Sequence, residues 1–365
     1  MKKYKFLLLS NSLLLFAFLF FGGLFFAREF LIPFCFAALL AMLMLPICQW
    51  LEKKGIYRGI SIFICILIII LSFSSVIFVL SAQIASFNKD IPQMKEELEN
   101  KADDLQSLIA SKANISYERQ ISFLKARLSL LSESADTFAK DFVLATTGTI
   151  VNLALIAIYI FFFMYYRDKF QNFVLKITQK NDHTTANEVM GEISHVTQKY
   201  LSGVIIVILI LSVLNSVGLL IIGVKHAVFF GCLAALLNIV PYIGVLIGSL
   251  FPIIMVLLTK ESIWAAIAVA GVFTFNQFLD NNFLTPNIVG SQVKVNPLTA
   301  IMALIIGGLI WGVAGMILFI PFLGIVKIIF DNVESLEPYA YLIGEDENST
   351  NKKTFTKIKS WFTKK

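Results

Sequence analysis

Long stretches without a single charged residue alternate with short polar segments along almost the whole chain. Eight of them occur, at residues 6–27, 30–50, 59–88, 142–166, 200–224, 227–259, 262–279 and 295–326. Each is close to, or longer than, the ~20 residues that a helix needs to cross about 30 Å of hydrocarbon. The pattern therefore predicts an all-α, polytopic membrane protein with about eight transmembrane helices.

Two of these stretches, 227–259 and 295–326, are longer than one plain span requires and contain clusters of proline or glycine. Splitting either stretch at its cluster gives helices of roughly 13–17 residues, at ~1.5 Å rise per residue. Broken and re-entrant helices are tolerated inside a bilayer where they are buried in protein or line a cavity. The sequence leaves open whether each stretch crosses the membrane or re-enters it.

The segment 85–141 interrupts the membrane pattern between the third and fourth stretches. Its apolar residues step by three and four positions, first from Ile84 to Leu98 and again from Ile121 to Phe142. Such heptad spacing is typical of helices that pack against one another. It predicts an antiparallel helical hairpin outside the membrane, which either packs on itself or on a neighbouring subunit, or docks a partner.

Lysine and arginine gather in four places: the start of the chain, the loops after the second and fourth stretches, and the tail. Because such residues near span ends are retained in the cytoplasm, we expect both termini there and the hairpin on the opposite side. The predicted organisation is transmembrane helices 1–3 in 1–84, the extracytoplasmic hairpin in 85–141, transmembrane helix 4 in 142–166, cytoplasmic interfacial helices in 167–199, a transmembrane transport core in 200–332 and a cytoplasmic basic tail in 333–365.

The amino-acid composition excludes several classes of protein. Hydrophobic residues make up 58% of the chain and charged residues 15%, which excludes an ordinary soluble domain. The net charge of +6 lies at span ends, so it indicates topology and a lipid surface and not nucleic-acid binding. The four cysteines lie in apolar stretches, and no HExxH, nucleotide-binding glycine run or nucleophile elbow occurs. We therefore expect no metal site, no cofactor and no enzyme, and any pumping must draw on an ion or solute gradient.

The most informative polar run is TFNQFLDNNFLTPNIVGSQVKVNP, from Thr274 to Pro297, because it lies between two long apolar segments. A carboxylate at this depth, Asp280, can bind a cation or exchange a proton, since burial disfavours its charged form while hydrogen bonds favour it. The alternative is a cap at the end of a helix. Asn276 with Asp280, and Gln277 with Asn281, are four residues apart, so the polar groups cover one broad helical face. That spacing favours the lining of a transport pathway.

The second half of this run is expected to be non-helical. Pro286 and Pro297 bound it and Gly290 lies between them, and proline removes a backbone donor and disfavours helix at the residue before it. Lys294 lies inside this loop. It either attracts an anionic or polyhydroxylated solute or reaches the lipid headgroups.

A second run, LLNIVPYIGVLIG at 236–248, carries another break. Pro241 is expected to end a helix beside Tyr242, and Asn238 can satisfy the backbone groups that the break leaves open. Gly244 lets a neighbouring helix approach closely, which is a packing role. For Asn238 and Tyr242 the sequence leaves open a role in transport or in packing.

These two runs resemble the signature half of the autoinducer-2 exporter family of bacterial inner-membrane proteins. The resemblance covers most of the chain and is most specific from 236 to 321. It implies secondary transport by a homo-oligomer, with some members described as exporters of the quorum-sensing signal autoinducer-2 and others as Na⁺ or Li⁺/H⁺ antiporters. The positions that match the family are Pro241, Tyr242, Gly244, Gln277, Asp280, Asn281, Pro286, Gly290 and Pro297.

One position departs from that family. The residue before the last proline of the run is often histidine in the family, whereas this chain has Asn296. If that histidine relays a proton in relatives, this chain either couples differently or relies on Asp280 alone. Three hypotheses follow: an exporter of a small polar solute coupled to H⁺ or Na⁺, a Na⁺(Li⁺)/H⁺ antiporter, and a non-transporting scaffold whose hairpin docks a partner.

Overall fold

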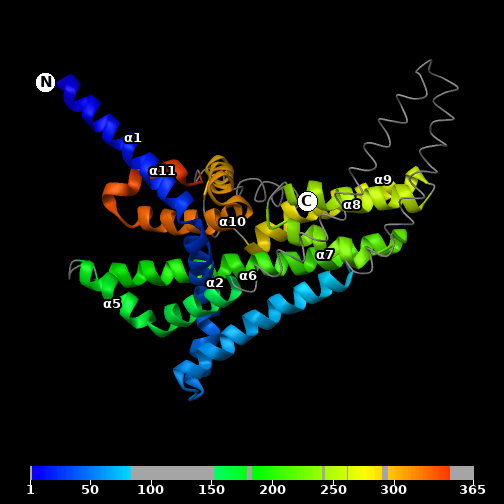
Figure 1. Cartoon of the computed structure of the whole chain (residues 1–365), viewed down its shortest axis with the longest axis horizontal. Helices are drawn as coiled ribbons and strands as arrows, with labels where there is room; N and C mark the ends of the chain where they lie inside the picture. Colours follow the sequence, from blue (N-terminus) through cyan, green and yellow to red (C-terminus); the bar gives the residue numbers. More distant parts are fainter. Residues whose placement is uncertain are drawn as a thin grey trace, which may run out of the picture. The chain divides into compact units, whose positions relative to one another are not determined.

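The computed structural model of the chain describes residues 2–83, 152–178, 183–240, 243–260, 262–289 and 295–345 (Figure 1). Within these residues the regular elements are helices, and the isolated antiparallel bridge of Val295 with Gly344 is the exception. The predicted extracytoplasmic hairpin and the basic tail beyond residue 345 lie outside the described residues. The all-α prediction is confirmed for the part that is described.

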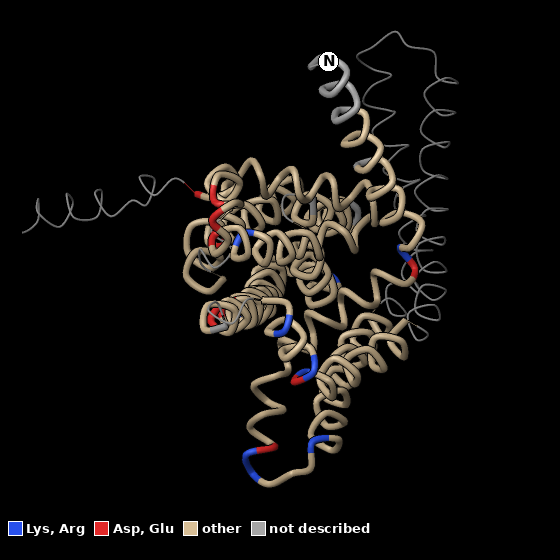
Figure 2. The backbone as a smooth tube through the Cα atoms, turned by 90° about the vertical axis from the view of Figure 1, so that its left-hand side faces the viewer, with Lys and Arg blue, Asp and Glu red and all other residues tan. Residues whose placement is uncertain are grey.

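Within the described residues, five helices are long and apolar enough to cross a membrane, and each overlaps a predicted stretch. They are Arg28–Lys53, Arg58–Gln83, Thr184–Ile222, Ile263–Val289 and Pro297–Asp331. Shorter apolar helices occur at Asn11–Phe26, Asn152–Tyr165, Ala227–Leu237 and Gly244–Leu257. Figure 2 shows that charged residues are sparse along these helices and lie mostly near their ends. The chain is therefore a polytopic membrane protein.

The labelled elements of Figure 1 have the following bounds. They are α1 (Lys2–Phe26), α2 (Arg28–Lys53), α5 (Arg167–Ile177), α6 (His183–Ile222), α7 (Ala227–Leu237), α8 (Ile243–Thr259), α9 (Ile263–Leu279), the π-helix η2 (Asp280–Val289), α10 (Pro297–Asp331), the 3₁₀ turn η3 (Glu334–Leu336) and α11 (Glu337–Ile343).

Two compact units are formed from non-contiguous segments. The first contains Met1–Ile62, Tyr159–Gly203 and Val289–Lys365, and the second contains Phe63–Ile158 and Val204–Ile288.

In the second unit, the long apolar stretch 227–259 is broken into α7 and α8. The backbone of Gly244 packs against the carbonyl of Leu237, and that of Gly248 packs against Ala234, so the two helices run antiparallel as a hairpin. The 11 residues of α7 span about 16 Å, well short of the ~30 Å hydrocarbon core. The hairpin and α9 share an apolar core that includes Phe230, Met255, Val256, Val269 and Phe273.

In the first unit, α10 is also broken. Gly312 has φ 61° and ψ −140°, a conformation that requires glycine because a side chain would clash with the backbone. The chain reverses there, so that Gly307 and Gly315 meet backbone to backbone. Trp311, beside the break, donates a hydrogen bond from Nε1 to the carbonyl of Leu24 at 2.9 Å, which fastens the tip of α10 to α1. Both long stretches are therefore broken helices, and each break lies in the proline or glycine cluster at which the sequence could be split.

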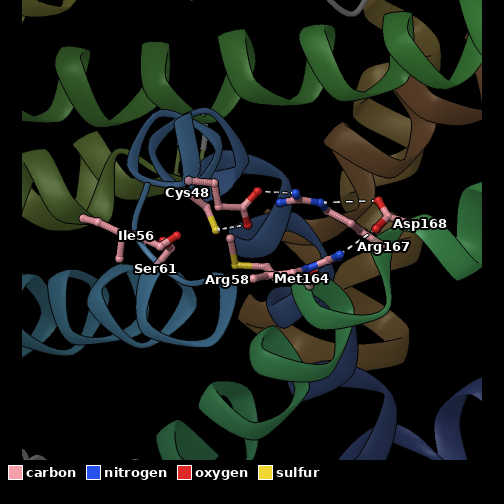
Figure 3. A network of polar contacts seen from close by, with 8 residues as sticks. Cys48, Ile56, Arg58, Ser61, Met164, Arg167 and Asp168 are labelled. Atoms are coloured by element: carbon pink, nitrogen blue, oxygen red, sulfur yellow. Dashed lines mark hydrogen bonds and ion pairs between the residues drawn. The ribbon is translucent and has the colours of Figure 1, made fainter. Parts of the chain in front are cut away.

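A cluster of ion pairs joins three segments of the first unit (Figure 3). Arg58 binds the carboxylate of Asp168 at 2.5 Å and donates to the carbonyl of Met164 at 2.8 Å, while Arg167 pairs with Glu52. The hydrogen bond from Arg58, with the charges of both arginines, lowers the pKa of Asp168 below its usual value. The loop after α2 and the start of α5 thus lie together, as expected for two flanks on one side of a membrane.

In the second unit, the close approach of α7 and α8 predicts that replacing glycine by alanine has opposite effects on stability at two positions. A Cβ at Gly248 would lie 2.7 Å from the Cα of Ala234, whereas a Cβ at Gly271 on α9 would have no neighbour within 4 Å. We expect Gly248→Ala to lower the free energy of unfolding by about 1–3 kcal/mol through overpacking. Gly271→Ala should raise it by about 0.5–1 kcal/mol by restricting the unfolded chain.

Denaturant titration of the purified protein in detergent measures both changes. Equal stability of the two variants would contradict the hairpin geometry.

Candidate functional site

The candidate site is built around Asp280, which ends α9 and begins η2 in the second unit. Its side chain is only 4% exposed. Each carboxylate oxygen accepts one hydrogen bond from a neutral donor: Oδ2 from Asn238 Nδ2 at 2.9 Å, and Oδ1 from the Thr285 hydroxyl at 2.7 Å. No lysine or arginine in the described ranges forms an ion pair with it. Among the described residues, this buried carboxylate is therefore held by two neutral donors alone.

The π-helical backbone explains why Thr285 reaches Asp280. In an α-helix, residues five apart lie about 140° from each other around the axis, so their side chains point away from one another. A π-helix closes i to i+5 hydrogen bonds and brings such residues onto one face. Pro286 lies inside η2; in α geometry its ring would clash with the carbonyl four residues earlier, and a wider turn relieves that clash.

The position of Pro286 corrects one expectation. The sequence predicts a non-helical loop from Pro286 to Pro297, but η2 continues through Pro286 to Val289. The wider π turn accommodates the proline, because it moves the carbonyl of the preceding turn away from the proline ring. Pro297 is the first residue of α10, where a missing N–H has no cost.

A second buried polar pair lies one turn before Asp280. Asn276 is 6% exposed and donates from Nδ2 to Oδ1 of Asn215 at 2.8 Å. Asn215 lies on α6, is 5% exposed, and was not among the candidates chosen from the sequence. A polar pair, Asn215 with Ser216, in the middle of the apolar stretch 200–224 was the signal that could have found it.

The other two amides of the run face a different way. Gln277 donates to Oδ1 of Asn281 at 2.9 Å, and both line a pocket of about 410 Å³ between α8 and the end of α9. The remaining lining residues are Val245, Leu246, Ser249, Ile253, Ala270, Phe273, Thr274, Phe278 and Asn282. The expected single broad polar face is therefore two faces: a buried one with Asn276 and Asp280, and an accessible one with Gln277 and Asn281.

The two polar runs meet in space, although they are far apart in sequence. Asn238 is the C-cap residue of α7, at the break of the first run, and it binds Asp280 of the second run. Gly244 packs against the turn before it, as its predicted packing role requires. Pro241, Tyr242, Gly290 and Lys294 lie outside the described residues, so their proposed roles stay predictions.

Asn296 forms a clasp in the first unit. Its Oδ1 accepts from the backbone N–H of Thr299 at 2.9 Å, which caps α10. Its Nδ2 donates to the carbonyls of Leu342 at 2.8 Å and Gly344 at 3.2 Å, and its backbone N–H donates to Ile343 at 2.9 Å. The structure gives this residue a role in joining the end of the motif to α11, in place of the proton relay considered for histidine.

The chain was also compared with known proteins. The sequence-family model described as AI-2E family transporter matches residues 14–335 of the chain. A putative transport protein of Bacillus subtilis, YueF, is 28% identical over 314 residues, covering 83% of this chain and 84% of that protein. The putative transport protein YhhT of Escherichia coli K12 is 24% identical, covering 88% and 90% of the two chains. The AI-2 transport protein TqsA of the same organism is 22% identical, covering 88% and 92%.

The clasp at Asn296 predicts how three variants differ in stability. Asn296→Ala removes the cap and both side-chain donors, so we expect it to lower the free energy of unfolding by about 2 kcal/mol. Asn296→Asp keeps the oxygen that caps α10, but it replaces the donor Nδ2 by a second oxygen. That oxygen is repelled by the carbonyl oxygens of Leu342 and Gly344, so this variant should be no more stable than the alanine variant. Asn332→Ala, at the other end of α10, loses one hydrogen bond to the Ile328 carbonyl and serves as the matched control.

Thermal unfolding, together with hydrogen exchange of residues 337–344, measures the effect. An aspartate variant as stable as the natural protein would show that Asn296 acts as a helix cap alone.

Proposed function

Because the chain belongs to the AI-2E family of transporters, we propose that it is a secondary transporter that exports a small polar solute across the bacterial inner membrane. Its family and relatives are described as transport proteins, so it is a transporter and not an enzyme. The observation that carries the proposal is the contact of Asn238 with Asp280, because it joins the two polar runs beside a pocket.

The pocket suggests the chemistry of the solute. Among the described residues that line it, Ser249, Thr274, Gln277, Asn281 and Asn282 offer neutral donors and acceptors, and none is charged. The rest of its wall is apolar, the usual composition of a small-molecule site, with a few polar groups to fix orientation. One relative is named an AI-2 transport protein. We propose autoinducer-2, or a neutral hydroxylated solute of similar size, as the cargo.

Coupling to H⁺ or Na⁺ would use Asp280. The described partners of this buried carboxylate are neutral, and burial of a charge is costly, so taking up a proton or a monovalent cation would relieve that cost. The same observation supports the second candidate function, a Na⁺(Li⁺)/H⁺ antiporter in which the ions themselves are the cargo. A non-transporting scaffold is set aside, because the chain belongs to a transporter family.

Topology and assembly are part of the proposal. We propose that both termini lie in the cytoplasm and that the hairpin α7–α8 and the broken helix α10 re-enter the membrane without crossing it. The contact of Arg58 with Asp168 supports a shared side for the loop after α2 and the start of α5. A homo-oligomer is proposed as well, because the family resemblance implies one.

Flux through proteoliposomes distinguishes the candidate functions. With autoinducer-2 as the probe, we expect Asn281→Leu to reduce flux about tenfold, because it removes a polar group from the pocket. Asp280→Asn should abolish coupling to a proton or sodium gradient. Ser72→Ala, which removes a hydroxyl bonded to the Ile68 carbonyl away from the pocket, is the control and should leave flux unchanged.

Two outcomes would overturn the exporter. In the first, no organic solute crosses while a sodium gradient drives proton movement that depends on Asp280, and the antiporter is then correct. In the second, neither solute nor ions move in a correctly folded protein.

Cysteine accessibility tests the topology. Single cysteines replacing Ser111, Lys225 or Ser349 on a cysteine-free background are exposed to a membrane-impermeant maleimide in intact cells. The first two should react, because their segments are proposed to lie outside, and the third should react only after the membrane is opened. Labelling of position 349 in sealed cells would contradict the proposed orientation.

A further inference from the structure

Asp280 poses a problem of hydrogen bonding as well as of charge. When it is ionised, its two oxygens accept from Asn238 and Thr285, and both neighbours are satisfied. When it is protonated, the new O–H must find an acceptor, or a buried donor is left unpaired. A residue that can both donate to the carboxylate and accept from the carboxylic acid is therefore needed beside it.

The two neighbours differ in this ability. The Nδ2 group of Asn238, which faces Oδ2, carries only donors, and Asn238 could accept there only if its whole amide turned over and broke the present bond. The Thr285 hydroxyl can reverse: it donates to the charged form, and after rotation it accepts the proton on Oδ1 and turns its own hydrogen away. Thr285 also lies on the exposed side of η2, whereas Asp280 is 4% exposed. Of the two described partners, only the Thr285 hydroxyl can therefore serve both forms of the carboxyl through one atom.

No other ionisable group takes over this role in the described part of the second unit. The ionisable side chains there, apart from Asp280, are Cys65, Lys225, His226, Cys232 and Lys260. The ammonium of Lys260 is bound to the carbonyl of Ile222. None of these groups hydrogen-bonds to Asp280, whose described partners are Asn238 and Thr285.

We propose that Asp280 is a proton-exchange site and that Thr285 is the positioning residue that makes the exchange possible. One proton passes from water to Oδ1 of Asp280; the Thr285 hydroxyl then turns from donor to acceptor, and no other bond forms or breaks. The reverse rotation releases the proton. The inference rests on the proposed transport function for its purpose, but its geometry and its test are independent of any solute.

The π-helix is the structural condition for this arrangement. Only with the i to i+5 geometry of η2 does the side chain of Thr285 face that of Asp280. A change of this segment to α geometry would turn Thr285 away and remove one hydrogen bond from the carboxylate. Because the Thr285 hydroxyl serves the carboxyl in both protonation states, the change would leave either form with one unsatisfied group, so the exchange depends on the π geometry of η2.

The proton can be observed without a transport assay. Dicyclohexylcarbodiimide adds to a buried carboxyl group only when it is protonated, and the stable N-acylurea that forms is located by mass spectrometry. In the purified full-length protein, we expect adduct on Asp280 to fall with rising pH around a definite midpoint. Asp280→Asn provides the blank for reaction at other carboxyl groups.

Variants of Thr285 then test the switch. Thr285→Val removes both the donor to the charged form and the acceptor for the acid, so the pH profile of adduct formation should differ from that of the natural protein by about tenfold in proton concentration. Thr285→Ser retains the hydroxyl and should restore the natural midpoint. Thr259→Val, which removes a hydroxyl bonded to the Met255 carbonyl on α8, is the matched control and should leave it unchanged. If the valine variant does not fold, Thr285→Ala replaces it, and size-exclusion chromatography checks every variant.

Two results would overturn the inference. One is a midpoint for Thr285→Val that equals that of the natural protein while Asp280 still reacts. The other is a natural protein in which Asp280 forms no adduct at any pH at which the protein stays folded. Loss of solute transport with a normal labelling profile would instead count against the exporter and leave the proton site intact.

Discussion

A carboxylate inside an apolar helical unit must receive hydrogen bonds from protein, because no bulk water can supply them. In this chain that requirement falls on Asp280, and the local architecture of the second unit meets it. The C-cap of α7 supplies the amide of Asn238, and the π turn of η2 supplies the hydroxyl of Thr285. Each donor stands at an irregularity of the backbone, so the breaks in the helices place the polar groups where the carboxylate needs them.

The same irregularities explain the two broken stretches. A helix that stops within the membrane leaves carbonyl and N–H groups without partners, and these must be covered by protein. Close backbone packing provides that cover: Gly248 against Ala234 in the hairpin α7–α8, and Gly307 against Gly315 in α10. Glycine is used at these positions because a Cβ would push apart the two helical segments of each hairpin. The breaks and the glycines are therefore one structural solution, repeated once in each unit.

The two faces of the amide-rich helix end suit two different kinds of bound species. The buried face holds Asp280 and suits a small charged species such as a proton, whereas the accessible face with Gln277 and Asn281 borders a pocket large enough for an organic solute. Both faces lie on the same helical turns, so a backbone change in η2 would reach both. This proximity provides a physical route by which ion and solute movements could be coupled in a transporter of this family.

Much of this was determined by the sequence alone. Charge-free stretches specify membrane helices because each must match the thickness of the hydrocarbon, and this constraint is local to each segment. The same reasoning identified Asp280 and the amides around it, since polar residues stand out in an apolar stretch. Tertiary structure decided which groups meet. That Asn238 and Thr285 would bond to Asp280, that Asn215 would pair with Asn276, and that Asn296 would clasp α11 depend on contacts between distant segments and on a π turn. Helical periodicity assumes α geometry with 3.6 residues per turn, so it cannot anticipate a pair five residues apart or the folding back of a helix at Gly312.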